Sequence, residues 1–260
     1  MIVRAAWSIA AAVIALVLPQ AVRAQAATAQ PAAPPPAQTA AQALAQAAPP
    51  APEGRPIKVY LRAGLKTHAA GQHDYPQFLA DWSKMLTERG AIVDGSFHFP
   101  TAEEIADVDV IVMYKGDAGY MTANEKAVLE TFLRRGGGLV SFHDTLCGDD
   151  PQYQANILGG AKKHGERNFS QGEITYTIAD TPSAKGHAGE IVPQIWTYEN
   201  TMAGGTQPYR AFVWMQGHNY TNFADPKLQP MILKGIAWAA KKPYDALMTV
   251  RPARGRSSGQ

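Results

Sequence analysis

Cysteine is nearly absent from this chain of 260 residues, which contains only Cys147. A single thiol excludes an intrachain disulfide, and one sulfur cannot build a thiolate metal site. Cys147 also lacks the basic neighbours that activate a nucleophile. The acids beside it in the sequence instead raise the pKa of a thiol and so disfavour the thiolate. We therefore interpret Cys147 as a small, semi-buried structural residue.

A strong excess of charge is absent as well. The chain has 24 Lys and Arg against 22 Asp and Glu, and two of the basic residues, Arg4 and Arg23, lie in the first 24 positions. The rest of the chain is formally neutral and shows no clustered Lys and Arg of the kind that contacts nucleic acid. We expect neither a nucleic-acid partner nor a nucleotide cofactor.

Long apolar runs are limited to residues 5–18, where Ser8 is the one interruption. This run is too short to span a bilayer comfortably, and small residues suited to cleavage follow it. The pattern predicts a signal peptide at residues 1–24, with an uncleaved membrane anchor as the alternative and no other membrane contact. We expect an exported protein, either periplasmic or secreted.

Three further regions follow from composition. Residues 25–55 are almost entirely Ala, Pro and Gln, and such a segment buries too little apolar surface to offset its ordering entropy. We predict a disordered linker there and a short disordered tail at 251–260. Residues 56–250 have a length suited to one globular domain.

Hydrophobic periodicity predicts alternating strands and helices in that domain. The capping box of Thr122 and Glu125 begins a helix that three glycines at 136–138 end. This order implies a parallel sheet. The last helix starts at Asp225 and Pro226, or nearer Pro230, and runs to residue 241. The predicted strands are 57–62, 91–97, 108–114, 139–142, 173–178 and 209–215; the earlier helices are 76–89, 101–106 and 122–135.

Polar residues follow several of these strands. The carboxyl ends of parallel strands share one edge, where ligands bind in open α/β sheets. We expect the candidate residues to converge there. The predicted catalytic residues are His73, His143, Asp144 and Glu166, the predicted substrate contacts are Lys115, Asp117 and Tyr220, and the predicted metal ligands are His73, His143, His164 and His218.

Histidine serves both as a metal ligand and as an acid–base group, and a neighbouring carboxylate orients its ring. The set suits a divalent metal such as zinc or manganese, or a metal-free acid–base site. No compact motif such as HExxH decides between them. Structural roles also stay open: Asp74 suits the N-cap of the following helix, and Asp117 and Asp144 suit turns.

Several motifs in order resemble those of the ThuA-like (trehalose-utilisation) family. The likeness covers residues 57–240 and includes Arg62-Ala63-Gly64, His73-Asp74-Tyr75-Pro76, Arg135-Gly136-Gly137-Gly138-Leu139-Val140, Phe142-His143, Gly217-His218-Asn219-Tyr220 and Leu233-Lys234-Gly235-Ile236-Ala237-Trp238-Ala239.

The resemblance implies a flavodoxin-like three-layer α/β sandwich of the class I glutamine amidotransferase type, with a mostly parallel sheet. Amidotransferases carry a nucleophilic Cys at the turn where this chain has His143, so glutamine hydrolysis is not expected. The family is linked to the catabolism of trehalose and keto-disaccharides. Near residue 180 this chain departs from the family pattern, lacking an acidic pair and a segment that would hold a strand or two.

Together these observations predict an exported protein that performs acid–base or metal-assisted chemistry on a small-molecule sugar. The reaction class stays open between hydrolase, lyase and isomerase. A non-catalytic sugar-binding or accessory module, or a deletion variant without activity, is the alternative that the departure near residue 180 favours. The sequence leaves the oligomeric state open.

Overall fold

The computed structural model describes residues 55–164, 169–171, 176–177 and 193–251. The predicted signal peptide, nearly all of the linker and tail, and residues 178–192, where the chain departs from the family pattern, lie outside the described residues. Most of the predicted strand at 173–178 does too. In the described part, no helix has both the length and the apolarity needed to cross a membrane.

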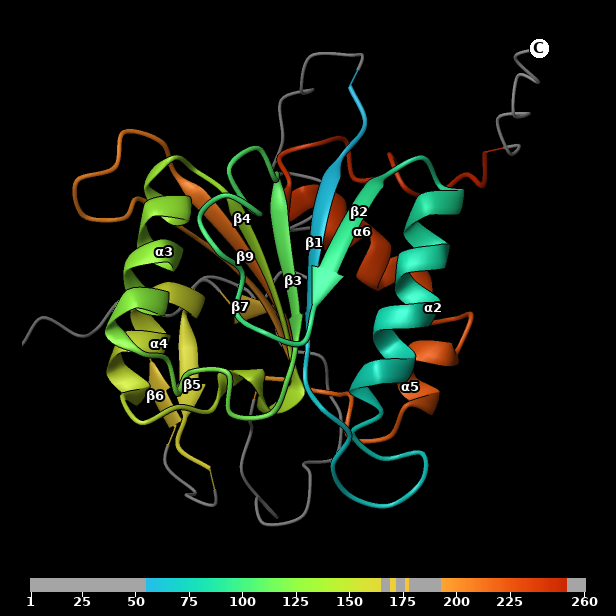
Figure 1. The fold of residues 1–260 in the computed structure, drawn as a ribbon, viewed down its shortest axis with the longest axis horizontal. Helices are drawn as coiled ribbons and strands as arrows, with labels where there is room; N and C mark the ends of the chain where they lie inside the picture. Colours follow the sequence, from blue (N-terminus) through green and yellow to red (C-terminus); the bar gives the residue numbers. More distant parts are fainter. Residues whose placement is uncertain (1–54, 165–168, 172–175, 178–192, 252–260) are drawn as a thin grey trace, which may run out of the picture. The chain divides into compact units, whose positions relative to one another are not determined.

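A seven-stranded sheet forms the centre of the domain, in the order β2-β1-β3-β4-β9-β8-β7 (Figure 1). The neighbours from β2 to β9 pair in parallel, and β8 and β7 are antiparallel. The predicted mostly parallel α/β sandwich is therefore confirmed. The strands are β1 (Lys58–Ala63), β2 (Ile92–Ser96), β3 (Val110–Tyr114), β4 (Gly138–Phe142), β7 (Tyr176–Thr177), β8 (Ile195–Asn200) and β9 (Tyr209–Trp214).

Helices cover both faces of this sheet (Figure 1). On one face, α2 (Tyr75–Glu88), α5 (Thr221–Ala224) and α6 (Gln229–Ala239) pack into one hydrophobic core. On the other, α3 (Ala123–Arg134) and α4 (Pro151–Leu158) pack into a second core. The central strands β3 and β4 are buried along their whole length, which explains their continuous apolar sequence. A short 3₁₀ helix, η1 (His143–Leu146), and the antiparallel pair β5 (Gly160–Lys162) and β6 (Phe169–Gln171) complete the described elements.

The boundaries of α3 follow from local chemistry. Thr122 Oγ1 accepts a hydrogen bond from the Glu125 backbone N–H, and the Glu125 carboxylate accepts one from the Thr122 N–H, so the predicted capping box is present. At the other end Gly136 adopts a φ of +84°, and its N–H donates to the Leu133 carbonyl. Two residues later β4 begins under α6, where a Cβ on Gly138 would lie 2.1 Å from the Ala239 carbonyl oxygen.

One predicted helix is wrong. Residues 101–106 form hydrogen-bonded turns, because Thr101 and Glu104 close a capping box that the short segment cannot extend into a helix.

The last helix begins at Gln229, with Pro230 in its first turn, which confirms the later of the two predicted starts. Asp225 instead ends α5, and its carbonyl accepts from the N–H groups of Leu228 and Gln229. Elements η1, α4, β5, β6, β8 and α5 were not predicted.

Candidate functional site

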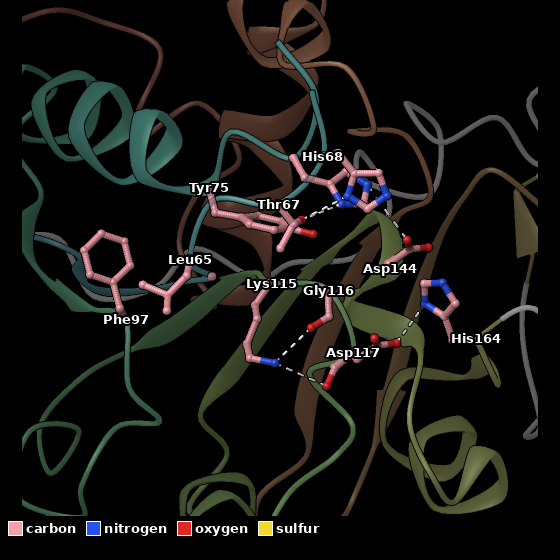
Figure 2. A pocket seen from close by; sticks show the side chains of 12 residues that line it. Leu65, Thr67, His68, Tyr75, Phe97, Lys115, Gly116, Asp117, Asp144 and His164 are labelled. Carbon is pink, nitrogen blue, oxygen red and sulfur yellow. Dashed lines mark hydrogen bonds and ion pairs between the residues drawn. The ribbon is translucent and has the colours of Figure 1, made fainter. Parts of the chain in front are cut away.

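A cavity of about 350 Å³ opens beyond the carboxyl ends of β1, β3 and β4, where the sequence places the candidate residues (Figure 2). Its wall contains imidazole, carboxylate, ammonium, hydroxyl and apolar side chains. Imidazoles come from His68, His73 and His164, and carboxylates come from Asp117 and Asp144. The remaining lining residues are the cation Lys115, the polar or aromatic Thr67 and Tyr75, the apolar Leu65 and Phe97, and the glycines Gly64 and Gly116.

Three histidines from three different loops meet at this edge of the sheet. Nε2 of His73, after β1, lies 3.0 Å from Nε2 of His143, after β4, and 2.9 Å from Nδ1 of His218, after β9. All three nitrogens lie within 4.8 Å of one another. The predicted convergence of His73, His143 and His218 is what the structure shows, and we call this group the three-histidine cluster.

The outer nitrogen of His143 fixes the protonation of its inner nitrogen. Nδ1 of His143 lies 3.1 Å from the Met215 carbonyl oxygen, which only accepts, so Nδ1 carries the proton and Nε2 of the neutral ring presents a lone pair toward the cluster. Nδ1 of His73 lies 3.2 Å from the Thr67 hydroxyl, which can donate or accept, so both tautomers of His73 are compatible with its neighbours. With the proton on Nε2, His73 donates to Nε2 of His143 at 3.0 Å; with the proton on Nδ1, both inner lone pairs are free to bind one metal ion.

The separation of the inner nitrogens is compatible with a metal ion after a small adjustment. Nitrogens about 2.1 Å from a metal lie about 3.0 Å apart at right angles and about 3.4 Å apart in a tetrahedral zinc site. The observed separations of 3.0 and 2.9 Å are close to the right-angle value and equal ordinary hydrogen-bond lengths. Asp144 adds negative charge beside the cluster, since its Oδ2 lies 3.4 Å from Nε2 of His143 and 3.9 Å from Nε2 of His73.

Burial keeps the imidazoles of His73 and His143 neutral, which is the form that binds a metal. His73 is 3 % exposed. Burial first, and then the nearby His143 and His68, lower the pKa of His73 to about 4. Burial also lowers the pKa of His143, against the opposing effect of Asp144. At neutral pH the cluster is therefore suited to binding a metal ion rather than a proton.

The backbone around the cavity is held in an uncommon conformation. Five non-glycine residues in the described part of the chain have a positive φ, and four of them belong to this site: His68, His73, Asp117 and His143, at 63°, 46°, 57° and 53°. Such conformations cost energy and concentrate at functional sites. They persist here because backbone hydrogen bonds tie the loops together, from His73 N to His218 O and from Asp117 N to Asp144 O.

Comparison with known proteins identifies the fold that carries this arrangement. No protein-family model and no curated protein matches the chain. A solved protein of Parabacteroides merdae described as ThuA-like is similar over 72% of this chain and 90% of its own, with 15% identity and a TM-score of 0.50. The chain has the ThuA-like fold. A second protein described as ThuA-like, from Bacteroides uniformis, is similar over 75% of this chain and 98% of its own, at 15% identity and a TM-score of 0.49.

Within this ThuA-like fold, two other predicted residues lie at the cavity. Lys115 lines it, and the Nζ of Lys115 donates to the Gly116 carbonyl at 2.9 Å, while burial lowers the pKa of the ammonium group. Asp117 lines it too and accepts from Nδ1 of His164 at 3.0 Å. His164 therefore belongs to a different group from the three-histidine cluster, and the prediction of one metal site with four histidines is wrong.

Two other residues do not have the contacts that the roles proposed for them require, and a third is untested. Tyr220 does not line the cavity; its hydroxyl bonds the Asp81 carboxylate at 2.5 Å, which joins it to α2. Asp74 occupies the N-cap position of α2, but its carboxylate pairs with Lys66 at 2.8 Å instead of capping the helix. Glu166 lies outside the described residues.

The ThuA-like fold also brings to the cavity residues that were given no role from the sequence. Thr67 and His68 share a hydrogen bond of 3.1 Å next to His73, and they lie in the loop after β1 that the strand-end rule already marked. Leu65 and Phe97 form an apolar rim and are 71% and 43% exposed. Their exposure is a tertiary property, so only a general rule that large exposed apolar residues border binding sites would have found them.

Proposed function

We propose that the protein is an exported enzyme that uses a divalent metal, held by His73, His143 and His218, for acid–base chemistry on a sugar carbonyl. One observation carries the proposal: nitrogens of His73, His143 and His218 lie within 4.8 Å of one another, and Nδ1 of His143 donates to the Met215 carbonyl, so its Nε2 lone pair faces the cluster. Neutral imidazoles that converge from three loops supply the lone pairs that a divalent metal binds.

The sugar class is supported by the family likeness and by the cavity. The motifs resemble a family linked to trehalose and keto-disaccharide catabolism, and a solved protein with this fold is described as ThuA-like. A cavity of about 350 Å³ is at the small end of ligand pockets, which suits one sugar ring at a time. The apolar rim of Leu65 and Phe97 offers a surface for the less polar face of such a ring.

When bound, the metal would supply Lewis-acid polarisation of a substrate oxygen. Two side chains of the protein, Asp144 and Lys115, carry out the proton transfer and the substrate binding. Asp144, beside the cluster, accepts a proton from the carbon or hydroxyl next to that oxygen. Lys115 donates a hydrogen bond to a substrate oxygen from the opposite side of the cavity wall. Its lowered pKa also lets it return a proton more readily than an exposed lysine does.

Two measurements test the proposal together. Protein purified without chelators is analysed for metal and assayed with trehalose and keto-disaccharides. His143→Ala should lose both the metal and turnover, while His98→Ala should keep both, since His98 is exposed and pairs with Glu104 away from the cavity. Full turnover or unchanged metal content in His143→Ala would overturn the proposal.

A sugar-binding module without turnover is the second candidate, favoured by the acidic pair that the sequence lacks near residue 180. Saturable binding of a disaccharide by the metal-loaded protein, with no product formed, identifies this function. A deletion variant that folds poorly would instead unfold over a broad, non-cooperative range on heating.

A further inference from the structure

We propose that the protein binds a second metal ion through Asp117, Cys147 and His164, and that Asp144 lies between this site and the three-histidine cluster. The second site stands on its own ligands. The bridging role of Asp144 rests on the proposed function, since it requires a metal at both places.

The three proposed ligands offer three kinds of donor at one place. Nδ1 of His164 lies 3.0 Å from Oδ1 of Asp117, and both lie within 4.8 Å of Sγ of Cys147. Asp117 follows β3, Cys147 follows η1 and His164 follows β5, so the fold alone brings them together. Three protein ligands leave a coordination position for water or substrate, which is typical of catalytic zinc sites.

The loops that carry these ligands are joined by their backbones. Asp117 N donates to Asp144 O at 3.0 Å, and Gly119 N donates to Cys147 O at 2.9 Å. A β-bridge between Cys147 and Lys162 connects η1 with the strand that precedes His164. The approach is so close that a Cβ on Gly119 would lie 2.8 Å from the Cys147 carbonyl oxygen. The thiol is therefore held in place before any ligand arrives.

The negative charge around Cys147 also favours binding of a cation. The thiol is fully buried, and its Sγ lies 3.9 Å from Oδ1 of Asp144 and within 4.8 Å of a carboxylate oxygen of Asp117. Within the described residues, the ion pairs of these two carboxylates are with histidines rather than with Lys or Arg. A divalent ion would neutralise the carboxylates and bind the thiolate.

Asp144 connects the two groups through its two oxygens. Oδ2 lies 3.4 Å from Nε2 of His143, and Oδ1 lies 3.9 Å from Sγ of Cys147. Figure 2 shows Asp144 between the His68 side of the cavity and the pair formed by Asp117 and His164. A carboxylate with one oxygen toward each site is the arrangement that a two-metal centre uses to hold its ions close together.

The ligand set predicts zinc at this second site. One thiolate and one imidazole are soft or borderline ligands, which disfavour magnesium, calcium and manganese. The sulfur also makes the site distinguishable by spectroscopy. Cobalt(II) bound to a thiolate gives a charge-transfer absorption in the near ultraviolet, whereas cobalt(II) held by three histidines does not.

The full mature chain is reconstituted with cobalt(II) and, separately, with zinc, and the metal bound per chain is counted. Wild type should bind two equivalents and show the thiolate band. Cys147→Ser and His164→Ala should each lose one equivalent and the band. His218→Ala should lose the other equivalent and keep the band, and His98→Ala should resemble wild type. Near-ultraviolet circular dichroism of each metal-free variant checks that it folds.

The outcomes separate the two proposals. A wild-type protein without the thiolate band, or a folded Cys147→Ser that keeps two equivalents, overturns the second site. Loss of metal from His218→Ala without loss of turnover overturns the proposed function and leaves the second site standing. Asp144→Asn tests the bridge: weakening of both equivalents supports it, and weakening of one alone overturns it.

Discussion

Nε2 of His73 lies 3.0 Å from Nε2 of His143, although 70 residues separate the two histidines in the chain. His143 donates its outer N–H to the Met215 carbonyl, so its inner nitrogen presents a lone pair to His73. This contact is the centre of the chemistry that we assign to the site.

The metal-free protein should lose stability as the pH falls from about 6.5 to 4. The pKa of His73 is about 4 in the folded chain, mainly because of burial, and about 6.5 when unfolded. The unfolded chain takes up the proton first, so this contribution is complete above pH 6.5 and is lost as the pH falls through 4. We expect a decrease in the free energy of unfolding of about 3 kcal/mol over this range.

Urea unfolding of chelated protein at a series of pH values measures this slope. His73→Gln removes the titrating group and should make the profile flatter. An identical slope in wild type and His73→Gln would show that His73 does not carry the effect.

Thr67→Val should weaken metal binding by about 10- to 100-fold without unfolding the protein. The Thr67 hydroxyl lies 3.2 Å from Nδ1 of His73, and in the metal-bound form it would accept the Nδ1 proton and so direct the lone pair of Nε2 into the cluster. Calorimetric titration of the apo protein with zinc measures the change. Thr131→Val is the matched control, because Thr131 bonds only its own helix, at the Ala127 carbonyl. Equal affinities for both variants would contradict the role of Thr67.

Lys115→Met should lower kcat/KM on the sugar substrate by about 10- to 100-fold, the value of a hydrogen bond to a charged group. The metal content should stay unchanged, because Lys115 lines the cavity without touching the three-histidine cluster. Steady-state kinetics and metal analysis are done on the same preparation. Lys84→Met, on the exposed side of α2, controls for the loss of a positive charge. Unaltered kinetics in Lys115→Met would remove it from the site.

Gly138→Ala should destabilise the fold by about 2 to 3 kcal/mol through overpacking. The added Cβ would lie 2.1 Å from the Ala239 carbonyl oxygen, which belongs to the backbone of α6 and moves only with the helix. Gly71→Ala provides the comparison. Its φ is +76° but its Cβ would meet nothing within 4 Å, so it should lose only about 1 kcal/mol from backbone strain. Chemical denaturation gives both values, and the opposite ranking would contradict the steric argument.

Local sequence was sufficient for elements whose boundaries are chemical. The capping box at Thr122 and the glycines at 136–138 place α3, and continuous apolar runs place β3 and β4. Local sequence failed to predict elements that depend on contacts with other segments of the chain. Residues 101–106 carry a capping box without a helix. The strand β8 was not predicted, because its position depends on pairing with β9. That pairing puts Trp196 in the core, where it is fully buried.

The candidate site also has features that the sequence predicted and features that only the structure shows. The rule that ligands gather beyond the carboxyl ends of parallel strands identified His73, His143 and His218 from the sequence, because sheet topology alone places those ends at one edge. The rule could not separate His164 from them. Nor could it show that Cys147, dismissed as a structural residue, lies beside Asp117 and His164.

The amino-acid sequence by itself determined the α/β class, most of the element boundaries and the edge of the sheet where the histidines gather, since periodicity, capping and strand order are local or topological properties. The tertiary structure alone decided which nitrogens face each other, which side chains the cavity leaves exposed and how the donors divide into two groups. Those properties depend on distances of a few ångströms between segments far apart in the chain, and no local pattern encodes them.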